Sequence, residues 1–434
     1  MTTNTAQTET ELYAFIEAEH PFYGPIQRFQ SWLRRAGFDQ EIAQRMDGAR
    51  WTEQSSLLGA RRMSAQTWRL KWLYWSIQFR HETLAGRFAA LTLIYFPEQD
   101  RIQRLEFPSD PRLPAATSLF GLTQNTASEL ADREVLRYVP RQRLTFRATS
   151  SQHSKPLIVG KLVRLDEWQD RYDRWVQVFR KASQSPQLSF TVPTPLGVDE
   201  DNGILFQQAM AGENVAELLD GDNAEDWLFT LGKIHQEIHA LEINQVPEWN
   251  LAEFLQHTFF KLEWVSFFQA RHAKLFGELR EFLLRYVPAV AGAQRVFCHG
   301  DFRCCQVLKD GQCWSVIDFD AAMRADPYWE IARFLTYLKK DVPLFEESKR
   351  AEETAGEGLL ERASVAYLRG YEEKRGEALN PARLAWFRIA CEIHFLARLL
   401  QRDRVNPAAI ERSIESIQAL RAGLDNLSPN WKPI

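Results

Sequence analysis

Two short predicted strands, each followed closely by an acid, constrain this chain more than any other feature. A strand is predicted from Arg295 to Cys298, and Asp301 lies in the turn that follows it. A second apolar run, Trp314 to Ile317, ends at Asp318, and Gln306 lies between the two acids. Two carboxylates and an amide are therefore expected on one loop edge. That set suits a base for a hydroxyl group and ligands for a hard divalent cation.

Length and composition predict a globular protein with more than one domain. The chain has 434 residues, 45% hydrophobic and 25% charged, and two or three domains are expected for this length. Its formal net charge of −4 gives no general attraction to nucleic acid or to acidic membranes. We therefore expect no nucleic-acid partner and no membrane partner, and the oligomeric state stays open.

No targeting or membrane-spanning segment is predicted. The stretch from Met1 to Glu11 is polar and lacks the basic and apolar regions of a secretory signal. The longest apolar run, Phe88 to Phe96, is too short to cross a bilayer. These two features lead us to expect a cytoplasmic protein.

Most of the cysteines crowd the stretch that carries the acids, yet a zinc site is not expected. Their spacing lacks paired C-x-x-C motifs, and two adjacent cysteines suit tetrahedral ligation poorly. Reduced, partly buried thiols are expected instead. The cysteines are Cys298, Cys304, Cys305, Cys313 and Cys391.

Residues 1–128 are predicted to form an accessory α+β domain. Helical patterns cover Glu11 to Glu19 and Gly24 to Ala36. From Trp51 onward, segments with alternating aromatic residues indicate an antiparallel sheet. Nothing in this domain suggests catalysis.

Residues 129–212 are predicted to form a small antiparallel lobe. Glu134–Val139 and Leu144–Ala148 read as a hairpin, and Lys161 lies inside the third strand. An amphipathic helix and two more strands follow. Residues 213–434 are mainly helical, apart from the two strands that precede the acids.

Three motifs then follow one another in a definite order: His299-Gly300-Asp301 with Gln306, Ile317-Asp318-Phe319-Asp320, and Asp326-Pro327. This order resembles the catalytic loop, the metal-binding motif and the following segment of the aminoglycoside phosphotransferase and choline kinase-like superfamily. The resemblance extends from about Val135 to Gly376. The first 128 residues resemble, more loosely, the extra N-terminal domain of maltokinase-type members.

The resemblance implies an α+β, bilobal protein-kinase-like fold, with a small antiparallel β lobe, a larger helical lobe and an additional N-terminal α+β domain. It also implies an ATP- and magnesium-dependent small-molecule kinase. Such an enzyme would transfer the γ-phosphate of ATP to a hydroxyl group of a sugar, amino sugar, aminoglycoside-like or amino-alcohol acceptor.

By the same resemblance, Asp301 is the base that orients or deprotonates the acceptor hydroxyl, and Asp318 binds magnesium. Gln306 stands where the family usually has Asn. Its amide oxygen is displaced by one methylene, so it binds the metal only if the loop adjusts. This substitution makes Gln306 the residue on which full activity depends most.

Lys161 falls where the family has its nucleotide-binding lysine, and a buried strand lysine needs such a purpose or a partner. The partner acid is expected from the following helix, where the choice stays open among Glu167, Asp170 and Asp173.

Other nucleotide contacts are expected from a hairpin turn and from the hinge between lobes. The hairpin has no glycine, so Arg141 and Arg143 either contact phosphate as point charges or form a solvated basic turn. The hinge around Gln208 and Met210 would offer backbone groups to a purine, and Met210 would either cover the base or fill the core.

The remaining polar residues of the motifs are expected to support the site. His299 is expected to bond backbone and fix its turn. Asp320 is either a second metal contact or a cap, and Asp326 is expected near a helix N-terminus. His235 and His239 lie four residues apart on one predicted helix and are expected to pack rather than bind metal.

Two functional questions stay open at this point. Glu253 and Glu263 would meet a cationic acceptor or would form a solvated helix face. The alternative to an active kinase is a catalytically weak or inactive pseudokinase that binds nucleotide or regulates a partner. Gln306 and the missing glycine loop favour that alternative.

Overall fold

The computed structural model describes residues 49–56, 60–62, 68–70, 73–81, 88–120, 130–150, 157–219, 223–287, 295–341, 353–400 and 407–427. They fall into two compact units, which we describe separately. The first comprises the described residues of Met1–Leu165 and Asp201–Ile204, and the second those of Asp166–Glu200, Leu205–Leu400 and Arg404–Ile434. The helices predicted between Glu11 and Ala36 lie outside the described residues.

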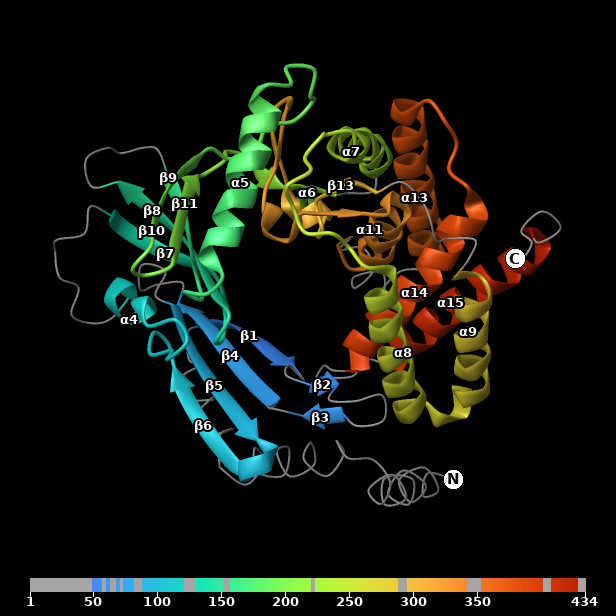
Figure 1. Ribbon diagram of the computed structural model, residues 1–434, viewed down its shortest axis with the longest axis horizontal. Coiled ribbons are helices and arrows are strands. Elements are labelled where there is room, and N and C mark those ends of the chain that lie inside the picture. Colours follow the sequence, from blue (N-terminus) through green and yellow to red (C-terminus); the bar gives the residue numbers. More distant parts are fainter. Residues whose placement is uncertain are drawn as a thin grey trace. The chain divides into compact units, whose positions relative to one another are not determined.

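The first unit begins with an antiparallel sheet, as the aromatic alternation predicted (Figure 1). Its strand order is β1-β4-β5-β6, and β2 pairs separately with β3. Most of β5 is buried, which explains its almost continuous apolar sequence. The elements are β1 (Ala49–Ser56), β2 (Ala60–Arg62), β3 (Trp68–Leu70), β4 (Leu73–His81), β5 (Phe88–Phe96), η1 (Pro97–Gln99), β6 (Arg101–Glu106) and α4 (Ala115–Phe120).

The predicted hairpin and third strand are confirmed in the same unit. They are β7 (Leu130–Val139), β8 (Arg143–Ser150) and β9 (Leu157–Val163), paired in antiparallel order. Arg141 has a positive φ of 62° at the turn between β7 and β8. A residue this far into the left-handed region needs local support.

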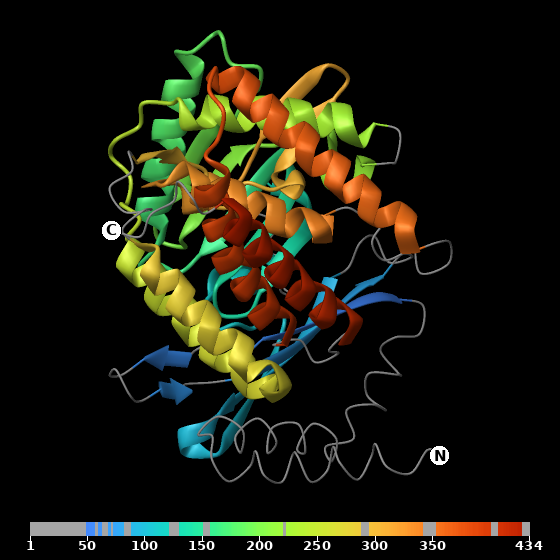
Figure 2. The same cartoon turned by 90° about the vertical axis from the view of Figure 1, so that its right-hand side faces the viewer.

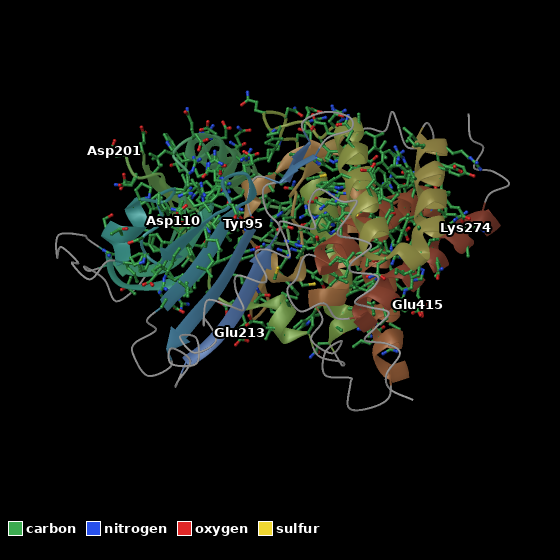
Figure 3. The ribbon with its side chains drawn as sticks, turned by 90° about the horizontal axis from the view of Figure 1, so that it is seen from below. Tyr95, Asp110, Asp201, Glu213, Lys274 and Glu415 are labelled. Carbon is green, nitrogen blue, oxygen red and sulfur yellow. The ribbon has the colours of Figure 1, made fainter. Side chains whose placement is uncertain are left out.

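Asp110 supplies that support from the segment before the hairpin (Figure 3). Its carboxylate is 2% exposed and accepts the Arg141 N–H at 2.7 Å and the Tyr138 hydroxyl at 2.8 Å. The other carboxylate oxygen accepts the Arg112 N–H at 3.0 Å.

Aromatic rings extend the same connection between the two segments. Phe88, Phe107 and Phe120 precede the hairpin, and their rings form a chain of edge and tilted contacts with Tyr138 and Phe146. The predicted border at residues 128 and 129 lies outside the described residues. The division into 1–128, 129–212 and 213–434 therefore stays a prediction.

The second unit is mainly helical and carries the predicted motifs. Its elements are α5 (Trp168–Ser183), β10 (Pro195–Asp199), β11 (Ile204–Gln208, from Leu205), β12 (Glu213–Asn214), α6 (Val215–Leu218), α7 (Ala224–His239), α8 (Leu251–Phe268), η2 (Ala270–His272), α9 (Ala273–Arg285), β13 (Val296–Cys298), η3 (Cys304–Gln306), β14 (Val307–Asp310), β15 (Cys313–Val316), η4 (Phe319–Ala321), β16 (Met323–Ala325), α11 (Pro327–Asp341), α13 (Glu353–Arg375), α14 (Pro381–Leu400) and α15 (Pro407–Leu427).

Helix α14 is the centre of this unit and packs against α8, α11 and α15 (Figure 2). Trp386, Phe387 and Ile389 on it are fully buried. A helix that is apolar around most of its circumference requires neighbours on several sides. No helix among the described residues is long and apolar enough to cross a membrane.

Helices α7 and α13 pack closely because glycines lie at their contact. A Cβ added at Gly232 would overlap the Tyr367 carbonyl oxygen, and one at Gly370 would overlap that of Phe229. Backbone therefore meets backbone at this crossing, which no larger residue permits. The contact fixes the position of α7, the helix that carries His235 and His239.

We expect Gly370→Ala to lower the free energy of unfolding by about 2–4 kcal/mol, because the methyl group would force the two helices apart. Gly277→Ala is the matched control, since a Cβ at this position on α9 meets nothing within 4 Å. It should raise stability by about 0.5–1 kcal/mol through helix propensity. Denaturant unfolding of both variants measures the difference, and equal effects would contradict the close-packing explanation.

Candidate functional site

His299 ties the loop of Asp301 to the segment that precedes Asp318. Its ring is completely buried, and Nε2–H donates to the Ile317 carbonyl over 2.9 Å. Nδ1 accepts the Asp301 backbone N–H at 3.3 Å. Both ring nitrogens are thus used to hold backbone.

Gly300 allows the two loops to approach one another. Its φ is +83°, and a Cβ on it would overlap the Ala321 carbonyl group. Only glycine fits both the backbone angle and the space.

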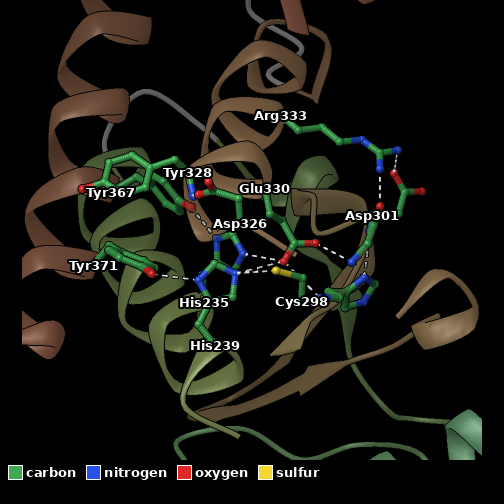
Figure 4. Close-up of polar contacts among 12 residues, drawn as sticks. His235, His239, Cys298, Asp301, Asp326, Tyr328, Glu330, Arg333, Tyr367 and Tyr371 are labelled. Carbon is green, nitrogen blue, oxygen red and sulfur yellow. Dashed lines mark hydrogen bonds and ion pairs between the residues drawn. The ribbon is translucent and has the colours of Figure 1, made fainter. Parts of the chain in front are cut away.

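Glu330, on α11, fixes the same loop (Figure 4). Its carboxylate is fully buried and accepts the backbone N–H groups of His299, at 3.0 Å, and Gly300. The same carboxylate accepts Nε2–H from His235 and from His239, each at 3.0 Å. A charged acceptor with four donors is well satisfied despite its burial.

The two histidines are held in one tautomer by their partners. Because the Glu330 carboxylate only accepts, Nε2 of each ring carries the proton, and Nδ1 accepts from the Tyr367 or Tyr371 hydroxyl. Burial, with the neighbouring His239 as the second cause, lowers the pKa of His235 to about 3. Burial alone would raise the pKa of Glu330, but hydrogen bonds from both histidines hold it well below its ordinary value.

The histidines were predicted to pack, and they do so as part of a polar network. Among the described residues, His235, His239 and Glu330 are also the one grouping whose ligand atoms lie within 4.8 Å of each other, as a metal site requires. The hydrogen bonds of 3.0 Å from both histidines to Glu330 account for that arrangement without an ion.

Asp301 is held by two arginines that the sequence did not single out. Arg303 Nη2 lies 3.0 Å from its Oδ2, and Arg333 Nη2 lies 2.6 Å from its Oδ1. Arg333 also donates to the Gly300 carbonyl. Position gave a weak signal: Arg303 follows Asp301 by two residues, and Arg333 follows Glu330 by three on one helix.

Gln306 and Asp318 lie side by side in the structure. Gln306 is 5% exposed, and its Nε2 donates to Asp318 Oδ2 over 3.2 Å. Backbone also joins the two segments, since the Ile317 N–H donates to the Gln306 carbonyl at 3.0 Å. Asp318 itself has a positive φ of 69° and directs its carboxylate from a strained turn.

Asp320 fastens helix α5 to this turn. Its carboxylate is buried and accepts Arg171 Nη1 at 3.0 Å and Trp175 Nε1 at 2.8 Å. Glu167, one of the acids considered for Lys161, forms an ion pair with Arg171 at 2.7 Å. The contact between Asp320 and α5 could not be predicted, because the two lie far apart in the sequence and nothing in the motif indicates α5 as a neighbour.

Asp326 caps the N-terminus of α11, near which it was expected. Its Oδ1 accepts the Tyr328 N–H at 2.9 Å, and its Oδ2 pairs with Arg383. Pro327 begins the helix, where its missing N–H costs nothing. Burial raises the pKa of Asp326.

The predicted nucleotide residues of the first unit lie on the β7–β9 sheet. Lys161 is 5% exposed on β9, opposite Thr145 of β8. The Arg141 guanidinium lies 5.6 Å from the centre of the Phe96 ring, and burial lowers its pKa. Arg143 begins β8.

The predicted hinge residues belong to the second unit. Gln208 ends β11 and is exposed, and its side-chain oxygen accepts the Thr194 hydroxyl at 2.9 Å. Met210 is half-buried. Gly212, at the end of this segment, has a φ of +105°.

A cavity of about 360 Å³ opens in the second unit next to the loop of Asp301. Arg333 connects them, because it lines the cavity and pairs with Asp301. Glu253 also lines the cavity, whereas Glu263 is absent from its lining and lies 3.8 Å from Arg280 on an exposed face. The lining includes Trp249, Glu253, Phe254, His257, Trp329, Arg333, Tyr337 and His394.

All five cysteines are free thiols. Three are buried, Cys305 is half-buried and Cys313 is exposed. The grouping of His235, His239 and Glu330 contains no cysteine.

Comparison with known proteins adds one family and several distant structures. The model of the phosphotransferase enzyme family matches residues 141–386, more than half of the chain. No curated protein matches. A GDP complex of aminoglycoside 2'-phosphotransferase-IIIa is 16% identical, with 72% of this chain and 99% of that chain covered and a TM-score of 0.44. Choline kinase LicA from Streptococcus pneumoniae is 16% identical, with 69% and 94% covered and a TM-score of 0.42. An ethanolamine kinase from Plasmodium vivax is 12% identical, with 67% and 81% covered and a TM-score of 0.42.

The Glu330 network makes stability depend on pH in a defined window. The pKa of His235 is about 3 when folded and 6.5 ordinarily, so the unfolded chain binds more protons between these values. Stability is therefore lost as the pH falls below 6.5. A full shift of this kind amounts to about 2 kcal/mol at pH 5. His235→Gln should remove this contribution, and the free energy of unfolding at pH 7 and pH 5, from urea titrations, measures it.

We compare no pH below 5, because there the Glu330 carboxyl of the unfolded chain takes up protons while the folded one, whose pKa is held well below its ordinary value, does not, and this adds to the same slope. His235→Gln is expected to be less stable than the wild type at pH 7, since two buried hydrogen bonds are lost. The slope decides the question. An unchanged pH dependence in the variant would contradict a neutral, buried His235.

Proposed function

Since this chain belongs to the phosphotransferase enzyme family and therefore transfers phosphoryl groups to hydroxyl acceptors, we propose that its donor is ATP with magnesium and that its acceptor binds in the cavity beside Asp301. One observation carries the proposal. Arg333 lines that cavity, and its guanidinium holds Asp301 at 2.6 Å. This contact supports a position for the predicted base near a space large enough for a small molecule.

Asp301 would orient the acceptor hydroxyl and accept its proton. Phosphoryl transfer requires alignment and charge neutralisation more than covalent chemistry. Arg303 and Arg333 fix the carboxylate plane, and a carboxylate with about four lone-pair sites still has acceptor capacity for a hydroxyl group. The acceptor proton would move to an oxygen of Asp301 as the hydroxyl oxygen bonds to the γ-phosphorus of ATP, and the bond from that phosphorus to the bridging oxygen would break to release ADP.

The donor set around Asp318 fits magnesium. Carboxylate and amide oxygens are the ligands that this cation prefers, and Asp318 and Gln306 lie 3.2 Å apart at their nearest polar atoms. Gln306 would present its oxygen after a rotation of the amide group. A bound magnesium ion supplies neutralisation of the phosphate charge.

The nucleotide would bind to the residues predicted from the sequence. Lys161 is a buried cation on β9 and would bind phosphate oxygens. Arg141 and Arg143 would add point charges, and Gln208 and Met210 would meet the base.

The acceptor class supported by the family is a sugar, amino sugar, aminoglycoside-like compound or amino alcohol. Trp249, Trp329 and Tyr337 give the cavity aromatic walls, which suit the face of a sugar ring. We propose a soluble, cytoplasmic setting for this reaction.

Asp301→Asn is expected to lower kcat about a hundredfold to ten-thousandfold, because asparagine cannot accept the hydroxyl proton. Asp310→Asn is the matched control: Asp310 is exposed at the end of β14 and should keep full activity. ADP release with a panel of sugars, amino sugars, aminoglycosides and amino alcohols measures turnover. An unchanged kcat in Asp301→Asn would sink the assignment of the base, and no turnover with any acceptor would favour the pseudokinase alternative.

Asp318→Ala is expected to weaken nucleotide binding in the presence of magnesium by about tenfold or more, because a charged ligand is lost. Binding without magnesium should change little. Fluorescence titration with a labelled ATP analogue, with and without the cation, separates the two effects. Full retention of magnesium-dependent binding would place the metal elsewhere.

A further inference from the structure

One wall of the cavity beside Asp301 is bordered by a group of basic residues, and neither the motifs nor the family accounts for them. This wall is formed where α8 packs on α14. His257 on α8 and His394 on α14 line the cavity. Lys261 and Arg398 lie one turn further along the same two helices and do not themselves line it. The Thr258 hydroxyl and His394 Nε2, 2.9 Å apart, join the two helices at this level.

Arginines that surround Tyr337 bring further positive charge to the same wall. Tyr337 lines the cavity, and Arg398 Nη1 donates to its hydroxyl over 3.0 Å. The guanidinium carbons of Arg398, Arg333 and Arg303 each lie 5.7 Å from the centre of its ring. Three like charges around one ring are mutually repulsive unless anions compensate them.

Most of the nearby carboxylates are already engaged. Asp301 is shared by Arg303 and Arg333. Glu248 pairs with Arg295 and with Arg324. Each carboxylate therefore serves two guanidinium groups.

Glu392 likewise pairs with Lys339 at 2.7 Å, and Glu253 remains as an exposed acid at the cavity. Within the described part of the chain, Lys261 and Arg398 form no ion pair with a carboxylate.

The titration behaviour of these groups agrees with an uncompensated positive charge. Burial lowers the pKa of His394 well below its ordinary value, and the charges of Lys261, His257 and Arg333 lower it further. Burial also lowers the pKa of Lys261, and Arg398 adds to the effect. An anion placed among these groups would offset the repulsion between their charges.

We propose that this wall is a subsite for an anionic substituent, so that the acceptor is a hydroxylated small molecule bearing a carboxylate, sulfate or phosphate group. The proposal rests on the proposed function, which assigns the cavity to the acceptor. Lys261 and Arg398 bind the anionic group, and the aromatic walls hold the body of the molecule. A cationic acceptor would be repelled by the same positive charges.

The first test uses inorganic sulfate as the probe, titrated calorimetrically into the full-length protein with saturating ADP and magnesium present. Lys261→Met and Arg398→Met should each weaken binding about tenfold, the factor that corresponds to one charge-assisted hydrogen bond. Methionine keeps an unbranched, apolar side chain, so packing is retained. Thermal unfolding checks that both variants fold.

Two matched controls remove the same charges elsewhere. Lys274 is exposed on α9 (Figure 3), and Arg412 is on α15. Lys274→Met and Arg412→Met should bind sulfate as the wild type does. If sulfate binds the wall variants as tightly as the controls, or does not bind the wild type, the subsite is refuted.

The second test compares acceptors that differ only in charge: glucuronate and glucose 6-phosphate against glucose and glucosamine, followed by ADP release. An acid-bearing sugar should exceed glucose at least tenfold in kcat/KM, and Arg398→Met should abolish the preference. Preference for the carboxylate or the phosphate identifies the anionic group. Preference for glucosamine would overturn the proposal.

The two hypotheses fail in different ways. If Asp301→Asn retains full turnover, the proposed base is wrong, and the sulfate titrations still decide the subsite. If turnover depends on Asp301 but ignores acceptor charge, and the wall variants bind sulfate normally, only the subsite falls. If none of these sugars is phosphorylated, the sulfate titrations alone support or refute the subsite.

Discussion

The buried carboxylate of Glu330 is the interaction on which the site depends. It accepts backbone N–H groups from His299 and Gly300 and side-chain donors from His235 and His239. One charge thereby connects α11, the loop after β13 and helix α7. Removing it would leave buried donors without acceptors, which is far costlier than the loss of an exposed ion pair. The loop that carries Asp301 keeps its conformation because any other conformation would leave these buried donors without an acceptor.

Arg333 connects reactivity with recognition. Its guanidinium contacts Asp301 and the Gly300 carbonyl, and it also lines the cavity. If the acceptor binds in the cavity as proposed, it lies close to the same side chain. Under that proposal, a substitution of Arg333 would affect both the position of Asp301 and the binding of the acceptor.

Much of the local structure could be predicted from the sequence. The hairpin of β7 and β8, the strand with Lys161, the helix with His235 and His239, and the cap at Asp326 all follow from patterns within a few residues. The family follows from motif order, and with it the α+β, protein-kinase-like fold class. The part of the accessory domain before residue 49 lies outside the described residues.

The long-range contacts could not be predicted in this way. His235 and Glu330 are separated by 95 positions, and Arg171 and Asp320 by 149. Hydrophobic periodicity shows which face of a helix is buried, but not which polar groups will meet across it. Arginines such as Arg398 also look like ordinary surface residues until a packed neighbour, here Tyr337, places them beside a cavity.

The Asp110 cap has a consequence for how the chain is divided. Its carboxylate accepts hydrogen bonds from two groups of the turn, the backbone N–H of Arg141, which has a left-handed backbone, and the buried hydroxyl of Tyr138. The strand pair predicted to touch phosphate is thus finished by a residue well upstream, in the segment that resembles an accessory domain. That segment therefore contributes a side chain to the hairpin of the β lobe, and a shorter protein that begins at β7 would lack the carboxylate that bonds this turn.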